Sequence, residues 1–398
     1  MLVYPFNVFD EEYESLMKKI EVSETGISIM RGRFETKTFM ISDISTPAAN
    51  VVKQQVLALG GEAAVPAHAV NCSKPKSDFV FSLRSDRLPE FVSRMKTQCW
   101  KLPQVADFIE NFIKSQKPWF SFSHDGIDTT RPNIMGILNV TPDSFSDGGS
   151  WTTVDSALKH AAEMLENGAD IIDIGGESTR PGSDSVDAET EKKRVIPVIS
   201  EIKKQFPKTV ISIDTVKSSV ADAAINAGAE MINDVSGLTF DPEMAYVCAA
   251  AAKPVVIGHV KGQPKDMQND PQYGDLFGEM LDFFNKSKDL VLSKGFPESK
   301  IIIDPGIGFG KTLQHNLAIL KHLEVFFACL NPVMLGFSRK SMIGAICGRR
   351  NPLERLAGTV ALDTAALEKG AAVIRVHDVR EAKDTLEIFN ALKESSCI

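Results

Sequence analysis

The chain has 398 residues, of which 43% are hydrophobic and 24% charged, with Gly 27 and Pro 20. These proportions are ordinary for globular proteins and exclude collagen-like, low-complexity and wholly disordered chains. The formal net charge of -8, from 44 basic and 52 acidic residues, argues against nucleic acid or an anionic membrane surface as a partner.

Neither an export signal nor a membrane anchor is expected. The start, MLVYPFNVFDEEYESLMKK, is acidic and lacks the basic and apolar regions of a signal peptide, and no apolar run could span a bilayer. The six cysteines are scattered without any C-x-x-C pair, which argues against a zinc site and a disulfide framework. We therefore expect a reduced, cytoplasmic protein.

The first part of the chain, residues 1–120, reads as a small α+β domain. The pattern predicts a helix over 48–59 closed by Gly60-Gly61, strands around 63–65 and 79–83, and a helix over 103–114. A stretch that contains Pro118, Ser121, Ser123 and Gly126 follows, and there we expect the join to a second domain, residues 121–398.

From Pro132 onward, short apolar runs alternate with amphipathic stretches of helical length. There are eight such runs, at 134–139, 169–174, 209–213, 229–233, 254–258, 300–304, 332–336 and 371–376. Apolar runs without strict alternation are typical of parallel strands buried on both faces. Eight β–α repeats predict a (β/α)₈ TIM barrel, and an open doubly wound sheet is the weaker alternative.

Polar residues stand where each predicted strand ends, and in such barrels that is where reacting groups lie. A single aspartate or asparagine there is more often a helix cap, but capping does not explain all eight strands. The residues are Asn139, Asp173, Asp214, Asn233 with Asp234, His259, Asp304, Ser338–Lys340, and Arg375 with His377.

Two loops, 140–150 and 177–185, combine Gly, Pro, Ser and Asp with one arginine, a composition suited to binding an anion. The run PGIGFGKT at 305–312 does not fit a phosphate-binding loop, because Pro305 stands where glycine is needed. It is expected instead to supply flexible backbone beside Asp304. The run SRKS at 338–341 precedes a helix and favours an anion, and Arg375 with His377 could hold a diphosphate.

Seven segments, in this order, resemble the dihydropteroate synthase family of the folate pathway. They are MGILNVTPDSFSDGG, DIGGESTRPG, SIDT, INDVSG, DPGIGFGK, GFSRKSMIG and IRVHDV, and the resemblance covers about Pro132 to Val379. It implies that hydroxymethyl-dihydropterin pyrophosphate and p-aminobenzoate react to give dihydropteroate and pyrophosphate, with Mg²⁺ as cofactor. The expected partners are these small molecules, and the expected assembly is a homodimer.

The resemblance also assigns residues, with Asn139, Asp214, Asp304, Lys340, Arg375 and His377 as the catalytic set. It places Asp214, Asn233, Asp304 and Lys340 around the pterin. It places Asn139, Arg180, Arg375 and His377 near pyrophosphate, with Asn139 at the metal. It places Thr179, Pro181, Phe309, Lys340 and Ser341 around p-aminobenzoate.

The sequence departs from the family at IGHVKG, where Gly258 and Val260 replace bulkier residues, which puts the fit around the pterin in doubt. The N-terminal segment resembles an extension of some longer members. Two alternatives stay open: a pterin-dependent methyltransferase, which has no use for the diphosphate-binding residues, and an inactive pterin-binding protein.

Overall fold

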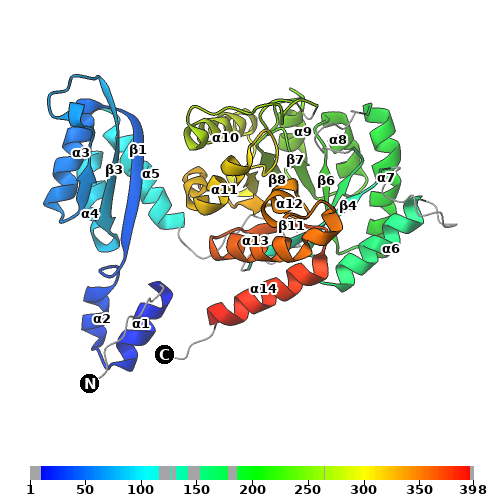
Figure 1. Ribbon diagram of the computed structural model, residues 1–398, viewed down its shortest axis with the longest axis horizontal. Coiled ribbons are helices and arrows are strands. Elements are labelled where there is room, and N and C mark those ends of the chain that lie inside the picture. The colour runs from blue at the N-terminus through cyan, green and yellow to red at the C-terminus, as the bar shows by residue number, and fades with distance from the viewer. Residues whose placement is uncertain are drawn as a thin grey trace. The chain divides into compact units, whose positions relative to one another are not determined.

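The computed structural model describes residues 10–115, 127, 131–141, 153–177, 186–263 and 265–394. The chain divides into two compact units, which meet in sequence at about residue 116 (Figure 1). Among the described helices, none is long and apolar enough to cross a membrane. The join expected near residues 118–126 lies outside the described ranges.

The first unit is an antiparallel sheet with helices. Its elements are α1 (Asp10–Lys19), α2 (Glu24–Met30), β1 (Thr36–Ser45), α3 (Thr46–Ala58), β2 (Glu62–Ala64), β3 (Lys76–Arg84), α4 (Leu88–Lys96) and α5 (Leu102–Ser115). The strand order is β1-β3-β2, with β3 antiparallel to both neighbours. Its core joins one face of the sheet to α3, α4 and α5, through Phe79, Phe81 and Phe91 among others.

The helices predicted at 48–59 and 103–114 and the strands at 63–65 and 79–83 are present with small shifts at their ends. The sequence reading did not include β1 or α4. In β1 the exposed residues alternate with half-buried ones, and exposed Met40 interrupts the polar side of that alternation.

The second unit is the predicted barrel. Its parallel strands are β4 (Asn133–Asn139), β5 (Ile171–Gly175), β6 (Val210–Asp214), β7 (Met231–Asp234), β8 (Val255–Gly258), β9 (Ile301–Asp304), β10 (Met334–Leu335) and β11 (Val373–Val376). Their order is β10-β11-β4-β5-β6-β7-β8-β9. A parallel bridge between Ile303 and Val333 brings β9 and β10 together, which nearly closes the sheet into a barrel.

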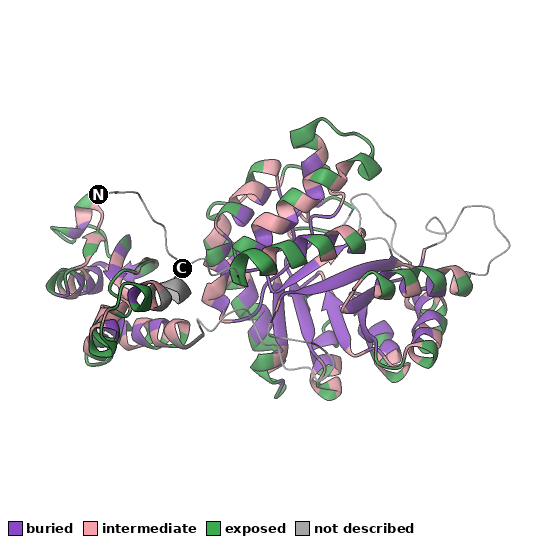
Figure 2. Ribbon diagram, turned by 90° about the horizontal axis from the view of Figure 1, so that it is seen from below, coloured by how far each residue is buried: buried purple, intermediate pink, exposed green. Residues whose placement is uncertain are grey.

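Helices surround the strands (Figure 1). They are α6 (Thr153–Glu166), α7 (Ala188–Gln205), α8 (Ser218–Asn226), α9 (Met244–Ala251), α10 (Leu276–Leu292), α11 (Leu313–Lys321), α12 (Ser341–Cys347), α13 (Leu356–Glu368) and α14 (Val379–Glu394). The strands are buried except at Asn139, Asp304 and Arg375, which are partly exposed, whereas the helices are exposed on their outer sides (Figure 2).

One apolar side chain from each strand fills the interior of the barrel. This cluster contains Met135, Ile171, Val210, Met231, Val256, Ile302, Met334 and Val373. Because side chains alternate along a strand, residues two and four positions further on face the same interior. Most of the polar strand-end residues lie at these positions and face the interior. The apolar layer therefore forms the floor of the candidate site.

Candidate active site

Arg375 lies between two buried carboxylates. Its Nε donates to Asp173 Oδ2 and its Nη2 donates to Asp214 Oδ2, both at 2.6 Å. Asn233 Nδ2 donates to the same Asp173 oxygen at 3.0 Å. These four side chains come from β5, β6, β7 and β11, so the cluster joins strands that lie far apart in sequence.

The cluster carries two acids and one guanidinium in a place shielded from water. Burial raises the pKa of Asp214 to about 7, although Arg375 opposes the rise and Asp173 adds to it. Asp214 Oδ1 is buried and has no hydrogen-bond partner in the described part of the chain. Since buried polar atoms nearly always have partners, this oxygen is an acceptor available to a ligand.

Asn139 lies beside this cluster at the end of β4. The sheet register runs from Asn139 to Gly175 and on to Asp214 and Asn233. A Cβ built on Gly175 would lie 3.7 Å from both Asn139 Oδ1 and Asp214 Cβ, so glycine leaves the space between them open.

Asp304 and Lys340 form the other side of the barrel mouth. Asp304 Oδ1 accepts the backbone N–H of Gly306 at 2.8 Å, and burial raises the pKa of Asp304. Lys340 Nζ donates to the carbonyl of Ile307 and lies 4.7 Å from the centre of the Phe309 ring. Removal from water lowers the pKa of Lys340 to about 8, against the effect of Asp304. Ser341 is the exposed first residue of α12.

His377 follows β11 and binds Ser338, whose Oγ lies 2.9 Å from His377 Nδ1 and 3.1 Å from its backbone nitrogen. Arg339, next to Ser338, forms a two-point ion pair with Asp378, its Nε lying 3.0 Å from Asp378 Oδ2 and its Nη2 2.5 Å from Oδ1. The segment after β10 is thus fixed to the end of β11.

The run PGIGFGKT, for which flexible backbone is expected, forms a loop with several hydrogen bonds to other parts of the barrel. Tyr273 Oη donates to the Gly310 carbonyl at 3.0 Å, and Asn316 Oδ1 accepts the Gly308 N–H at 2.9 Å. Gly306 has φ +65°, and a Cβ there would lie 2.0 Å from the His259 carbonyl oxygen. The carbonyls of Gly306, Ile307 and Phe309 in this loop accept hydrogen bonds from the side chains of Lys311 and Lys340.

Gly258 does not leave a void in the site. A Cβ at this position would lie 2.6 Å from Val235 Cα and 2.9 Å from the Asp234 carbonyl oxygen. The backbone after β7 therefore occupies the space that a larger residue would take. Asp234 itself is fully buried and its Oδ1 accepts from the Ser236 N–H at 2.7 Å, so it acts as a turn residue.

The structure brings together Asp214, Asn233 and Arg375, and separately Lys340 and Phe309. Thr179, Arg180 and Pro181 lie outside the described residues, as does most of the loop 140–150. Asp173 stands among the predicted strand-end residues but not among the assigned site residues. Asp173 lies two residues beyond the inward-facing Ile171, just as Arg375 lies two residues beyond the inward-facing Val373. This spacing could have identified Asp173 as a site residue.

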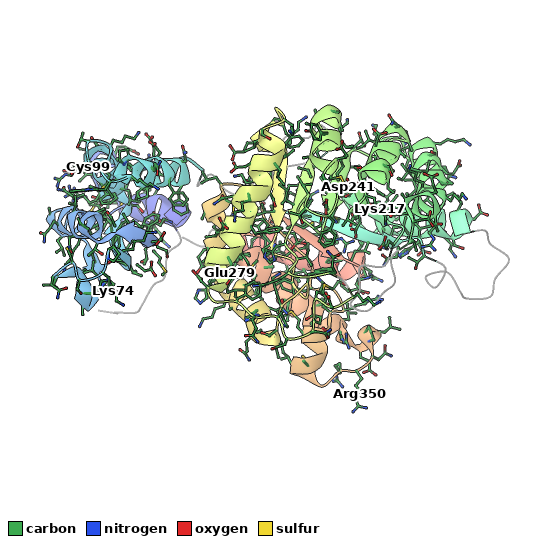
Figure 3. The ribbon with its side chains drawn as sticks, turned by 90° about the horizontal axis from the view of Figure 1, so that it is seen from above. Lys74, Cys99, Lys217, Asp241, Glu279 and Arg350 are labelled. Atoms are coloured by element: carbon green, nitrogen blue, oxygen red, sulfur yellow. The ribbon has the colours of Figure 1, made fainter. Side chains whose placement is uncertain are left out.

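Sequence reasoning also missed an ion-pair cluster beside the end of β5. Lys217, labelled in Figure 3, donates to Glu177 and, at 2.5 Å, to the buried Glu191. Arg194 Nη1 donates to the Gly176 carbonyl at 2.7 Å. Two cations therefore hold the described residues that lead into the loop 177–185.

The sequence pattern described as pterin binding enzyme matches residues 135–377. Dihydropteroate synthase of Escherichia coli is 43% identical over 265 residues, which cover 67% of this chain and 93% of that protein. The enzyme of Bacillus subtilis is 46% identical over 261 residues, 65% of this chain and 88% of that protein. The chain belongs to the pterin-binding enzyme family.

A solved structure agrees with this membership. The dihydropteroate synthase of Xanthomonas albilineans with 4-aminobenzoic acid has a TM-score of 0.63 and 43% identity, and the match covers 67% of this chain and 94% of that one. The likeness belongs to the pterin-binding barrel, because the family pattern begins only at residue 135.

Proposed function

We propose that the barrel condenses hydroxymethyl-dihydropterin pyrophosphate with p-aminobenzoate to give dihydropteroate and pyrophosphate. The relatives from Bacillus subtilis and Escherichia coli are named dihydropteroate synthase. A relative from Xanthomonas albilineans, 39% identical, has been solved in complex with 7,8-dihydropteroate. The observation that carries the proposal is the buried cluster of Asp173, Asp214, Asn233 and Arg375, with an unpartnered acceptor on Asp214.

The carboxylate cluster suits the pterin. An aminopyrimidine edge presents N–H donors, and a carboxylate with a neighbouring amide complements them. Asp214 Oδ1 supplies an acceptor, Asn233 lies on the adjacent strand, and Asp304 faces the same interior from β9. In this proposal Arg375 orients both acids, in addition to its assigned place near the diphosphate.

The leaving diphosphate is assigned to Asn139, Arg180, Arg375 and His377. Among the described residues there is no cluster of three His, Cys, Asp or Glu side chains able to hold a metal. Asn139, with one amide oxygen beside the space left by Gly175, suits Mg²⁺, which takes most of its ligands from water and substrate phosphates. When bound, Mg²⁺ neutralises charge on the departing diphosphate.

The amine substrate is assigned to the face formed by Phe309, Lys340 and Ser341, with Thr179 and Pro181. The Phe309 ring offers an apolar surface to an aromatic amine, and Lys340 offers a cation to its carboxylate. The bond between the pterin methylene carbon and the diphosphate oxygen breaks as the amine nitrogen attacks that carbon. The amine nitrogen loses its proton afterwards. No strong base is needed for this sequence.

Turnover of both substrates by the full-length chain tests the proposal. We expect dihydropteroate and pyrophosphate in equal amounts, with loss of turnover in Arg375→Ala. A chain that binds pterin yet forms no product would be an inactive binding protein. Methyl transfer from a methylated pterin to a corrinoid acceptor, without condensation, would identify the methyltransferase alternative.

We also propose a cytoplasmic homodimer. The five cysteines within the described ranges are free thiols, which suits a reducing compartment. Ile388 and Leu392 are exposed apolar residues one turn apart on α14, which suits a contact between copies. Light scattering on the wild type and on Ile388→Glu tests the assembly: we expect a dimer that weakens in the variant.

A further inference from the structure

Lys311 is a buried lysine that has none of the roles assigned above. It follows the glycine-rich loop, is 3% exposed, and precedes Thr312, the cap of α11. Its Nζ lies 2.9 Å from His259 Nδ1, 3.0 Å from the Gly306 and Phe309 carbonyl oxygens, and 3.2 Å from the His259 carbonyl oxygen. A single amine therefore joins the end of β8 to the loop after β9.

The segment that Lys311 holds is the one on which Lys340 rests. The two loop carbonyls bound by Lys311, those of Gly306 and Phe309, lie on either side of Ile307 in the sequence. Ile307 gives its carbonyl to Lys340 Nζ, and Phe309 gives its ring to the same amine. Displacement of this short segment would move both contacts of Lys340 together.

Only part of the pterin side of the mouth is held by other interactions, because Asp304 Oδ1 accepts the N–H of Gly306 in the loop that Lys311 holds. Asp304 pairs with Gly258 in the sheet, and its carbonyl accepts the His259 N–H at 2.9 Å. Asp214 and Asn233 belong to strands that Lys311 does not contact in the described structure. Loss of Lys311 would therefore disturb the two sides of the mouth unequally.

His259 completes the connection. Because its Nδ1 faces the Lys311 amine, we assign the ring proton to Nε2. The ring centre lies 4.7 Å from that of Phe283 in an edge-to-face contact, which fixes its orientation. Burial lowers the pKa of His259 well below its ordinary value, so the ring stays neutral beside the lysine.

We propose that Lys311 is a positioning residue for the amine substrate: it holds the Gly306–Phe309 loop so that Lys340 and Phe309 form the surface against which p-aminobenzoate binds. The inference rests on the proposed condensation and adds to it a residue that touches neither substrate.

The test is steady-state kinetics of full-length Lys311→Met with each substrate varied in turn. We expect KM for p-aminobenzoate to rise roughly 10- to 100-fold, because small misplacements of a binding surface carry costs of this size. We expect KM for the pterin pyrophosphate to rise by a smaller factor, since Asp214 and Asn233 are held separately, although Asp304 and Lys340 contact the loop.

Lys288→Met is the matched control. Lys288 is also buried, 8% exposed on α10, and donates to the Cys329 carbonyl at 2.6 Å. Its loss should lower stability without altering either KM. A similar rise of both KM values in Lys311→Met, or no rise in either, would overturn the inference.

His259→Gln serves where Lys311→Met does not fold, because it alters one of the four acceptors and leaves the lysine in place. This variant should raise KM for p-aminobenzoate more than KM for the pterin pyrophosphate, but by a smaller factor than Lys311→Met does. An unchanged KM for p-aminobenzoate would overturn the inference. Absence of turnover in the wild type would overturn the proposed function, whereas turnover with an unaltered KM in the variants would overturn the inference alone.

Discussion

Arg375 shows how a buried site can hold more acid than base. Its guanidinium supplies one positive charge to Asp173 and Asp214, and Asp173, which is 0% exposed, also accepts the Asn233 amide. Among the described residues, Arg375 is the cation that hydrogen-bonds to Asp214, and burial raises the pKa of Asp214 to about 7. The group is therefore poised between its two protonation states at neutral pH, while Asp173 is fixed as the anchor of Arg375.

Asp214→Asn should weaken binding of a pterin ligand by about 1 to 3 kcal/mol, since an amide places a misdirected donor where a carboxylate oxygen stood. Calorimetric titration measures the affinity, and thermal melting checks the fold. Asp241→Asn is the control: Asp241, labelled in Figure 3, accepts the Ser218 N–H at 2.8 Å outside the assigned site. Pterin affinity equal to that of the wild type would show that Asp214 is no ligand.

Lys340 predicts a pH dependence for the amine substrate. Removal from water lowers its pKa to about 8, so the ammonium that attracts a carboxylate is lost as the pH rises through that value. KM for p-aminobenzoate should therefore increase above about pH 8 in the wild type. In Lys340→Arg the charge persists to higher pH. An identical profile in the arginine variant would assign the dependence to another group.

At the scale of elements, the barrel strands were predictable and part of the site was not. Each strand is a short apolar run buried on both faces, so composition alone marks it, and alternation then places Asp214 and Arg375 toward the interior. β1 was missed because exposed Met40 interrupts its alternation of polar and half-buried residues, and its pairing with β3 is not visible in the local sequence. The hydrogen bonds of the glycine-rich loop were missed because their partners, Lys311, Tyr273 and Asn316, are brought to the loop by the tertiary fold.

Helix α13 holds an acid whose burial makes stability depend on pH. Asp363 is 1% exposed, its Oδ1 has no hydrogen-bond partner within the described ranges, and burial raises its pKa to about 8. The folded-state value lies above the unfolded value of about 3.9. The stability contributed by proton binding is therefore complete below about pH 4 and is lost as the pH rises through about 8.

Asp363→Asn removes this dependence, because the amide carries no charge at any of these pH values. Its melting temperature should exceed that of the wild type at about pH 9 and approach it at about pH 5. Asp289→Asn, at an exposed position of α10, should keep the slope of the wild type. Parallel curves for Asp363→Asn and the wild type would show that Asp363 does not titrate in this range.

At the scale of the whole molecule, each unit has a core of its own. The core of the first unit is built from residues between Ile44 and Ile109, and the main core of the barrel from residues between Ile134 and Leu386. The polar residues of the site all belong to the barrel. We therefore expect the barrel to fold by itself and to carry the chemistry.

A chain reduced to residues 121–398 should fold and keep its affinity for the pterin, since every barrel strand and every assigned residue lies within it. Circular dichroism measures the fold and calorimetry the pterin affinity. An unfolded product would show that the N-terminal unit is required for the barrel to form, and a folded product without affinity would show that it contributes to binding.

The place of Arg375 in the last strand has a consequence for biosynthesis. A ribosome synthesises β5 and β6 long before β11, because Asp173 precedes the shared cation Arg375 by 202 residues and Asp214 precedes it by 161. The strand that brings this cation also pairs Val373 with Asn133 of β4, the first barrel strand to emerge. The strand that closes the sheet therefore also brings the one cation that Asp173 and Asp214 share, and a chain that ends before β11 would lack both the closure and the cation.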